Sequence, residues 1–501
     1  MSNNTAPRSY GNWTKPRSAG LLGLGSLGTG ILFAGAAATV LTVVAAGLLP
    51  AVLVAVAFGL FLATISFRDA HGQSALMKGA TRVGWFNTRR SGSNIYRSGV
   101  LGRADWGTAQ LPGLMAGSRL TEGVDSWKRP FAMIQVKTAT GDDYTVVFGT
   151  EPDGAALVDQ EQIDNWVSEW GMFLANMGDE PGIEAVSVTV ETSPDTGSRL
   201  RREVAGRMDP AAPAFAKQLL NEIVATYPPG SSTVRAYVAI TFSSAARAGG
   251  KKRSSEEMGY ELAARIPGLT QSLAATGAGA THPLSAQQLC EVIRTAYDPA
   301  AATLIDEANS AGEPPELYWP DVGPVAAQAN WDSYRHDAAV SVTWMMTGAP
   351  RGNVHSGILA RLLAPHRDID RKRITLLFRP MDAGRAAGIV EADVRSASFN
   401  ISSSDKPTAR DQTRMIAALA TAAEEARGGG LVNFGMLVTA TVTDVDRLED
   451  ARAAIDNLAP TARLRLRPVY GSQDSAFAAA LPLGLVLPKH LQIPSQIREQ
   501  L

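Results

Sequence analysis

The feature that most constrains the fold is a long stretch without a charged side chain. Between Gly20 and Phe67 the chain contains no Asp, Glu, Lys, Arg or His. A bilayer core about 30 Å thick needs roughly 20 apolar residues for each helical pass, so the stretch is long enough for two passes. We place the first pass at residues 21–45 and the second at residues 51–67. A turn at residues 47–50 separates them, and its proline suits a helix start.

The flanks of this stretch indicate its orientation. Arg8, Lys15 and Arg17 precede it without an acid, and the basic residues that follow it up to Arg103 have only Asp69 among them. Cytoplasmic loops carry an excess of Lys and Arg, so we predict that both flanks lie on the cytoplasmic side of the inner (plasma) membrane. A cleaved signal peptide is the alternative, but the apolar run is several times longer than a signal-peptide core.

Length and charge bound the remainder of the chain. At 501 residues it exceeds one ordinary hydrophobic core, which favours two or more compact units. The formal net charge of −1 provides no overall basic field of the kind that gathers nucleic acid. The single cysteine, Cys290, excludes an intramolecular disulfide and fits a reducing cytoplasm.

Hydrophobic periodicity predicts mixed αβ structure after the hairpin. For a first unit it predicts strands at 131–138, 144–150, 183–191 and 234–242 and helices at 159–177 and 213–227. Helices at 260–273 and 285–297 follow, the second with a capping box formed by Ser285 and Gln288. For a second unit it predicts strands at 338–347, 373–379 and 431–443 and helices at 355–363, 408–427 and 445–458. The second unit resembles the first in its layering, without a visible residue-level repeat.

The predicted fold class is therefore α+β, with an N-terminal two-helix transmembrane hairpin followed by two α/β-sandwich units in the cytoplasm. The predicted boundaries are 1–19 for a cytoplasmic tail, 20–67 for the hairpin, 68–125 for a basic membrane-proximal connector, 126–245 for the first αβ domain, 246–335 for a helical and loop connector, 336–490 for the second αβ domain and 491–501 for a C-terminal tail.

The connector holds the candidate binding residues. Aromatic side chains alternate there with arginines, a mixture that suits lipid headgroups or a protein partner. Stacking and charge could also contact nucleic acid. The predicted membrane-interface or partner contacts are Arg82, Trp85, Arg89, Arg90, Arg97 and Arg103.

No motif of catalysis is recognisable in the sequence. The phosphate-binding pattern G-x-x-x-x-G-K-[ST] does not occur, and the nearest approach, at residues 250–252, reads as a solvated basic loop. The histidines are scattered without zinc-site spacing, and Cys290 falls inside an amphipathic helix. We predict no catalytic, cofactor-binding or metal-binding residue and a protein that is not an enzyme.

Two resemblances suggest a role. The layout of the chain is similar to that of EccE, the membrane-anchored, non-ATPase subunit of type VII (ESX) secretion translocons in actinobacteria. The likeness lies in the hairpin, the helix ending Asn176-Met177-Gly178, and the segments Phe131-Ala132-Met133-Ile134-Gln135-Val136 and Gly182-Ile183-Glu184-Ala185-Val186-Ser187-Val188. The segment from Gln473 to Gly484 resembles the end of the N-terminal, non-motor domain of VirB-type conjugation ATPases of type IV secretion.

These resemblances imply a structural subunit of a secretion or conjugation machine. Such a subunit would dock a separate cytoplasmic P-loop ATPase and other membrane subunits in an oligomeric assembly, without a cofactor of its own. Two alternatives stay open. One is a membrane-tethered enzyme of unrecognised chemistry, and the other is a membrane-tethered nucleic-acid-handling factor that uses Arg82, Arg89, Arg90 and residues 251–253.

Overall fold

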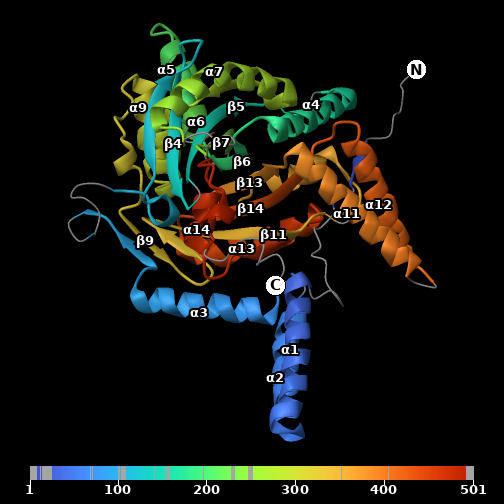
Figure 1. Cartoon of the computed structure of the whole chain (residues 1–501). Helices are drawn as coiled ribbons and strands as arrows, with labels where there is room; N and C mark the ends of the chain where they lie inside the picture. The colour runs from blue at the N-terminus through green and yellow to red at the C-terminus, as the bar shows by residue number, and fades with distance from the viewer. Residues whose placement is uncertain are drawn as a thin grey trace.

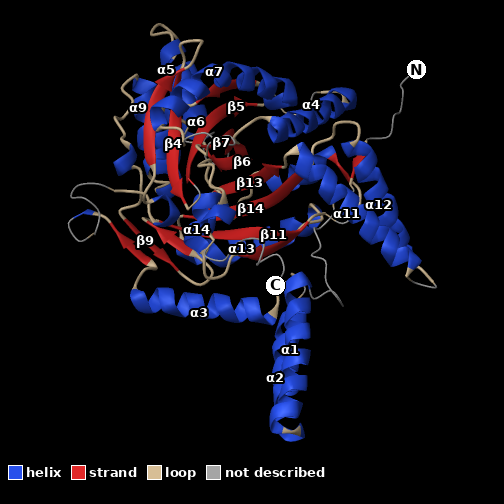
Figure 2. Ribbon diagram, viewed as in Figure 1, coloured by secondary structure: helices blue, strands red, loops and turns tan. Residues whose placement is uncertain are grey.

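The structure, a computed structural model, describes residues 8–11, 13, 25–67, 69, 71–99, 102, 109–139, 141–152, 154, 158–195, 197–226, 232–245, 252–350, 352–403 and 406–491. It is a mixed α/β protein with one large antiparallel sheet and two N-terminal apolar helices (Figures 1 and 2). The two helices project from the body as a separate hairpin (Figure 1).

The hairpin consists of α1 (Gly25–Ala46) and α2 (Leu48–Ser66). Gly47 alone separates them, with a φ of 90° that glycine adopts without strain. The second helix begins earlier than predicted, because a proline is tolerated in a first helical turn. The two helices pack closely at Gly35, where a Cβ would lie 2.7 Å from the Phe58 ring. Both helices are long and apolar enough to cross a membrane.

The sheet has two halves with the same element order. The first half comprises β3 (Arg119–Val124), β4 (Pro130–Thr138), β5 (Gly141–Glu151), α4 (Gln160–Asp179), β6 (Ile183–Pro194), α5 (Ser198–Arg207), α6 (Ala214–Thr226), β7 (Ser232–Ser243), α7 (Ser255–Leu273), β8 (Ala280–Pro283) and α8 (Ala286–Tyr297). Its strands lie in the order β3-β4-β5-β7-β6, and β8 also pairs with β5.

The second half repeats this order after α9 (Ala301–Ala311). It comprises β9 (Ala326–Ala329), β10 (Tyr334–His336), β11 (Ala339–Gly348), α10 (Ala360–Leu363), β13 (Arg371–Pro380), α11 (Ala383–Ser402), α12 (Ala409–Glu425), β14 (Val432–Val442), α13 (Leu448–Thr461), β15 (Arg465–Pro468) and α14 (Gln473–Ala479). Its strands lie in the order β9-β10-β11-β14-β13, and β15 also pairs with β11. The topology is therefore duplicated, with β9 equivalent to β3 and β15 to β8.

The two halves form one continuous sheet, so the structure does not confirm the two α/β-sandwich units that the sequence predicted. Strands β6 and β13 stand at the adjoining ends of the two strand orders. They pair with each other in an antiparallel register centred on Thr189 and Thr375. The two threonine hydroxyls are 3.2 Å apart. Equivalent strands thus meet at the seam, as a twofold relation between the halves requires.

Helices cover both faces of the sheet, because its strands place apolar side chains on alternate sides. One face packs against α4 and α7 in the first half and α13 in the second half. The other face packs against α8 and α14. Helices α7 and α8 fall within the predicted connector 246–335, yet they supply core residues such as Leu262 and Ile293. Residues 255–297 of that segment are therefore part of the first half, since these helices bury their apolar faces against this sheet.

The C-terminal segment ties the two halves together. After α14 it crosses the seam, where the Thr375 hydroxyl donates to the carbonyl of Ala480 at 2.6 Å. In the first half the Thr241 hydroxyl donates to the carbonyl of Gly484 at 2.8 Å, and Lys489 pairs with Asp143 at 2.8 Å. The segment from Gln473 to Gly484, which resembles the end of a domain in its sequence, therefore lies inside the fold and connects its two halves through hydrogen bonds.

Most predicted elements are confirmed, including the capping box at Ser285. The sequence reading missed α11, which pairs with α12 at the side of the body (Figure 1). The predicted helix 355–363 is shorter, because residues 356–359 form a 3-10 turn before α10.

Candidate membrane-facing site

A short loop turns the chain from α2 into α3 (Ala75–Ser91). The Asp69 carboxylate organises this loop, since it accepts hydrogen bonds from the backbone N–H groups of His71 and Gln73, both at 2.9 Å. Its partner Lys78 lies 2.8 Å away and contributes most to holding the pKa of Asp69 well below its usual range. In Figure 1, α3 starts beside the body-side end of the hairpin and runs away from it beneath the body.

Helix α3 has an inner and an outer face. On the inner face Trp85 packs against the core cluster that α8 and α14 share with β9, and it lies 6.1 Å from the ring of Trp331. On the outer face Val83 is 70% exposed and Phe86 is 66% exposed, and basic side chains flank them. Exposed apolar residues beside cations are typical of a helix that lies in a membrane interface.

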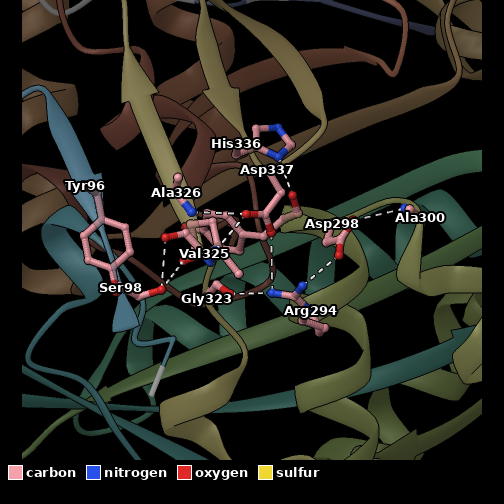
Figure 3. A network of polar contacts seen from close by, with 12 residues as sticks. Tyr96, Ser98, Arg294, Asp298, Ala300, Gly323, Val325, Ala326, His336 and Asp337 are labelled. Atoms are coloured by element: carbon pink, nitrogen blue, oxygen red, sulfur yellow. Dashed lines mark hydrogen bonds and ion pairs between the residues drawn. The ribbon is translucent and has the colours of Figure 1, made fainter. Parts of the chain in front are cut away.

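The strand β2 (Ile95–Arg97) fixes the far end of α3 to the sheet. It pairs with β9, and the hydroxyl of Ser98 donates to the carbonyl of Val325 at 3.0 Å. Figure 3 shows how this edge is held: Asp337 accepts the backbone N–H of Val325 at 2.7 Å and lies 3.5 Å from the guanidinium of Arg294. From Ile95 to Ser98, the predicted connector is therefore a structured part of the body.

Two adjoining cavities lie where the hairpin, α3 and β15 meet. One has a volume of about 410 Å³, and its lining includes Lys78, Arg82 and Arg467. The other has a volume of about 560 Å³, and its lining includes Arg463 and Arg465. Both cavities share the loop residues between α2 and α3. The sequence reading did not select the arginines of β15, although the Arg-Leu alternation from residue 463 to 467 is a signal that places arginines on one face of a strand.

Helix α3 brings together most of the predicted contact residues. Arg82, Trp85, Arg89 and Arg90 all lie on it, and the three arginines are exposed. Arg97 lies at the end of β2 and is also exposed, in continuation of the same edge. Arg103 lies outside the described residues. The aromatic residue of the set differs from the arginines, because Trp85 faces the body instead of the solvent.

The N-terminal flank of the hairpin returns to the body, a contact that the sequence reading missed. The strand β1 (Ser9–Tyr10) pairs with β12 (Val354–His355), and the Tyr10 hydroxyl donates to Asp164 at 3.2 Å. The Trp13 ring lies 5.4 Å from that of Phe434, in an apolar groove beside α12. Both flanks of the hairpin therefore contact the same folded body.

The groups considered for metal binding, nucleophilic chemistry and phosphate binding have the following surroundings where the structure describes them. Within these residues no group of three His, Cys, Asp or Glu side chains could hold a metal ion. Burial raises the pKa of the Cys290 thiol to about 12, which disfavours a thiolate. In the predicted solvated basic loop, Lys251 lies outside the described residues, and Lys252 is 52% exposed and pairs with Asp142 at 3.1 Å. The neighbouring Arg253 pairs with Glu261. Opposite charges of the fold neutralise these two cations.

Comparison with known proteins adds one finding, which concerns the hairpin. A family model described as a domain of unknown function (DUF8461) matches residues 17–77, from before the first helix to the start of α3. No curated protein matches the chain. The match coincides with the candidate membrane segment and its following loop, so this part of the chain is similar to a recurrent domain.

Proposed function

We propose that this protein is a membrane-anchored, non-ATPase structural subunit of a secretion or conjugative translocation machine. The hairpin would span the plasma membrane twice, and the duplicated αβ body with both hairpin flanks would lie in the cytoplasm. The observation that carries this proposal is that residues before and after the hairpin contact one body while the hairpin projects from it.

The exposure of the hairpin supports a lipid environment. Its apolar side chains point outward, for example Leu41 at 69%, Val44 at 82% and Leu48 at 74% exposed. Contiguous apolar surface of this kind marks a membrane or protein contact in a folded chain. The turn at Gly47 carries no charge, which suits a hairpin that barely emerges on the far side of the bilayer.

The surface of the body supports a role in assembly. Apolar side chains are exposed on three helices away from the hairpin: Phe215 of α6 at 76%, Phe399 of α11 at 69% and Ile416 of α12 at 69%. Such residues fit contacts with sister subunits and a separate P-loop ATPase. The assignment to a secretion or conjugation system rests on the likeness in architecture to EccE and to the non-motor domain of VirB-type ATPases.

Reporter fusions test the topology. A reporter that is active only in the cytoplasm is fused at the N-terminus, after Arg103 and, as the matched control, within the hairpin turn at Gly47. We expect activity at the first two positions and none at the turn. Reporters that place the N-terminus and Arg103 on opposite sides of the membrane would refute the hairpin.

Gentle extraction from the native membrane tests the machine. The full chain is solubilised in mild detergent after crosslinking, and co-purifying proteins are identified by mass spectrometry. A P-loop ATPase together with other membrane subunits is the expected result. A protein that emerges alone would move the proposal to a membrane-tethered enzyme.

A further inference from the structure

The cavity of about 410 Å³ between α3 and β15 has the charge of an anion-binding site. Three cations line it, Lys78, Arg82 and Arg467, against one carboxylate, Asp69. Asp69 is occupied by Lys78 and by two backbone N–H groups of its own loop. Neither Arg82 nor Arg467 forms an ion pair with a carboxylate in the described part of the chain. Their two positive charges are therefore left for a ligand.

Aromatic contacts hold one of these cations in place. The Arg467 guanidinium lies 5.3 Å from the centre of the Tyr470 ring, and Tyr470 stacks on Trp331 at 5.6 Å with an angle of 19°. Trp331 in turn contacts Trp85 of α3. A guanidinium held on an aromatic face loses less side-chain freedom when it binds an anion, because its position is set before binding.

The position of the cavity specifies the source of the anion. Its lining includes Asp69 and His71, which follow α2 within a few residues, so it opens where the hairpin joins the body. The adjoining cavity extends the basic lining with Arg463 and Arg465. On the outer face of α3, Val83 and Phe86 are exposed beside this region.

We propose that this cavity binds the phosphate headgroup of an anionic phospholipid from the cytoplasmic leaflet. Guanidinium groups match phosphate oxygens in paired, charge-assisted hydrogen bonds, and basic pockets at the cytoplasmic ends of membrane helices favour anionic headgroups. Arg82 and Arg467 hold the phosphate, while Val83 and Phe86 face the acyl-chain boundary. The inference rests on the proposed membrane hairpin, since it is the hairpin that brings the cavity to the headgroup layer.

Titration calorimetry on the full chain in a non-ionic detergent tests the site. The ligands are a short-chain phosphatidylglycerol, the matching phosphatidylcholine and inorganic phosphate. We expect phosphatidylglycerol to bind, and Arg82→Gln or Arg467→Gln to weaken its binding about tenfold, the order of one charge-assisted hydrogen bond. Arg395→Gln is the matched control, because Arg395 is an exposed arginine of α11 that lies outside the cavity, and its replacement should leave the affinity unchanged.

Each other outcome overturns the proposal in a different way. Inorganic phosphate that binds as tightly as phosphatidylglycerol identifies a site for a soluble anion. If phosphatidylcholine binds equally well, the cavity does not select an anionic headgroup. If both arginine variants bind lipid as wild type does, the headgroup does not bind in this cavity. Arg82 is exposed, so its variant folds and keeps the test valid if Arg467→Gln does not.

A separate measurement distinguishes this inference from the hairpin itself. Native membranes are washed with alkaline carbonate, which releases proteins that are not inserted. A chain that stays in the membrane but fails to bind phosphatidylglycerol refutes the headgroup site alone. A chain that the wash releases refutes the anchoring on which the site depends.

Discussion

The seam between the two halves of the sheet depends on a buried carboxylate. Glu191 of β6 forms ion pairs with Arg371 and with Arg373 of β13, the second at 2.5 Å, and the three side chains are between 4% and 11% exposed. Replacing Glu191 by Gln removes the negative charge and leaves two guanidinium groups buried without their counter-ion. Breaking a buried ion pair in this way destabilises a protein by roughly 3–5 kcal/mol.

The pKa of Glu191 supports the same magnitude. Burial by itself raises this pKa, but Arg371 and Arg373 outweigh burial and lower it from 4.5 to about 2. At about 1.4 kcal/mol per pH unit, the lowering corresponds to about 3 kcal/mol. Because the folded pKa is the lower one, this stabilisation is complete above pH 4.5 and disappears as the pH falls towards 2.

Urea unfolding of the full chain in non-ionic detergent measures this effect. With a slope of about 3 kcal/mol/M, a loss of about 3–4 kcal/mol lowers the unfolding midpoint of Glu191→Gln by about 1 M at pH 7. The matched control is Glu391→Gln, because Glu391 and its partner Arg395 are 71% and 70% exposed. An exposed pair contributes at most about 1 kcal/mol, so the control should unfold near the wild-type midpoint. Equal midpoints for Glu191→Gln and wild type would refute the role of the buried pair.

Three further outcomes are expected. Gly484→Ala lowers the free energy of unfolding by about 2 kcal/mol or more, because a Cβ there lies 2.3 Å from the Thr241 hydroxyl; an unchanged urea midpoint would contradict this. Cys290 does not react with a thiol reagent at pH 8 until urea unfolds the chain, since burial keeps its pKa high; fast labelling of folded protein would contradict the buried site. Trp13→Ala removes the contact of the N-terminal flank with Phe434, so limited proteolysis should cleave the chain before α1 faster than in wild type. Equal cleavage rates in the variant and wild type would contradict this.

The candidate site shows where sequence reasoning stops. Basic and aromatic composition indicated the connector, and four of its selected residues do lie on α3. The cavity partners Arg467, on β15, and Tyr470, just after it, lie several hundred positions later in the chain, and no local pattern connects them with Arg82. The inward orientation of Trp85 was equally inaccessible, because it depends on the position of Trp331.

The sequence by itself determined the local elements of this protein. The absence of charge from residue 20 to 67 marked the two apolar helices, and alternating or helical spacing marked most strands and helices, because burial of one face imposes a period of 2 or 3.6 on the side chains. Local capping was also legible, as at Ser285, since it involves residues only three positions apart.

Only the tertiary structure decided how these elements combine. The pairing of β6 with β13 joins two halves into one sheet, the C-terminal segment crosses that seam, and both hairpin flanks return to the body. Backbone hydrogen bonds between strands are chemically the same for every pair, so the choice of partner follows from which arrangement buries all the apolar faces together. That choice belongs to the whole chain and leaves no periodic signal in any one segment.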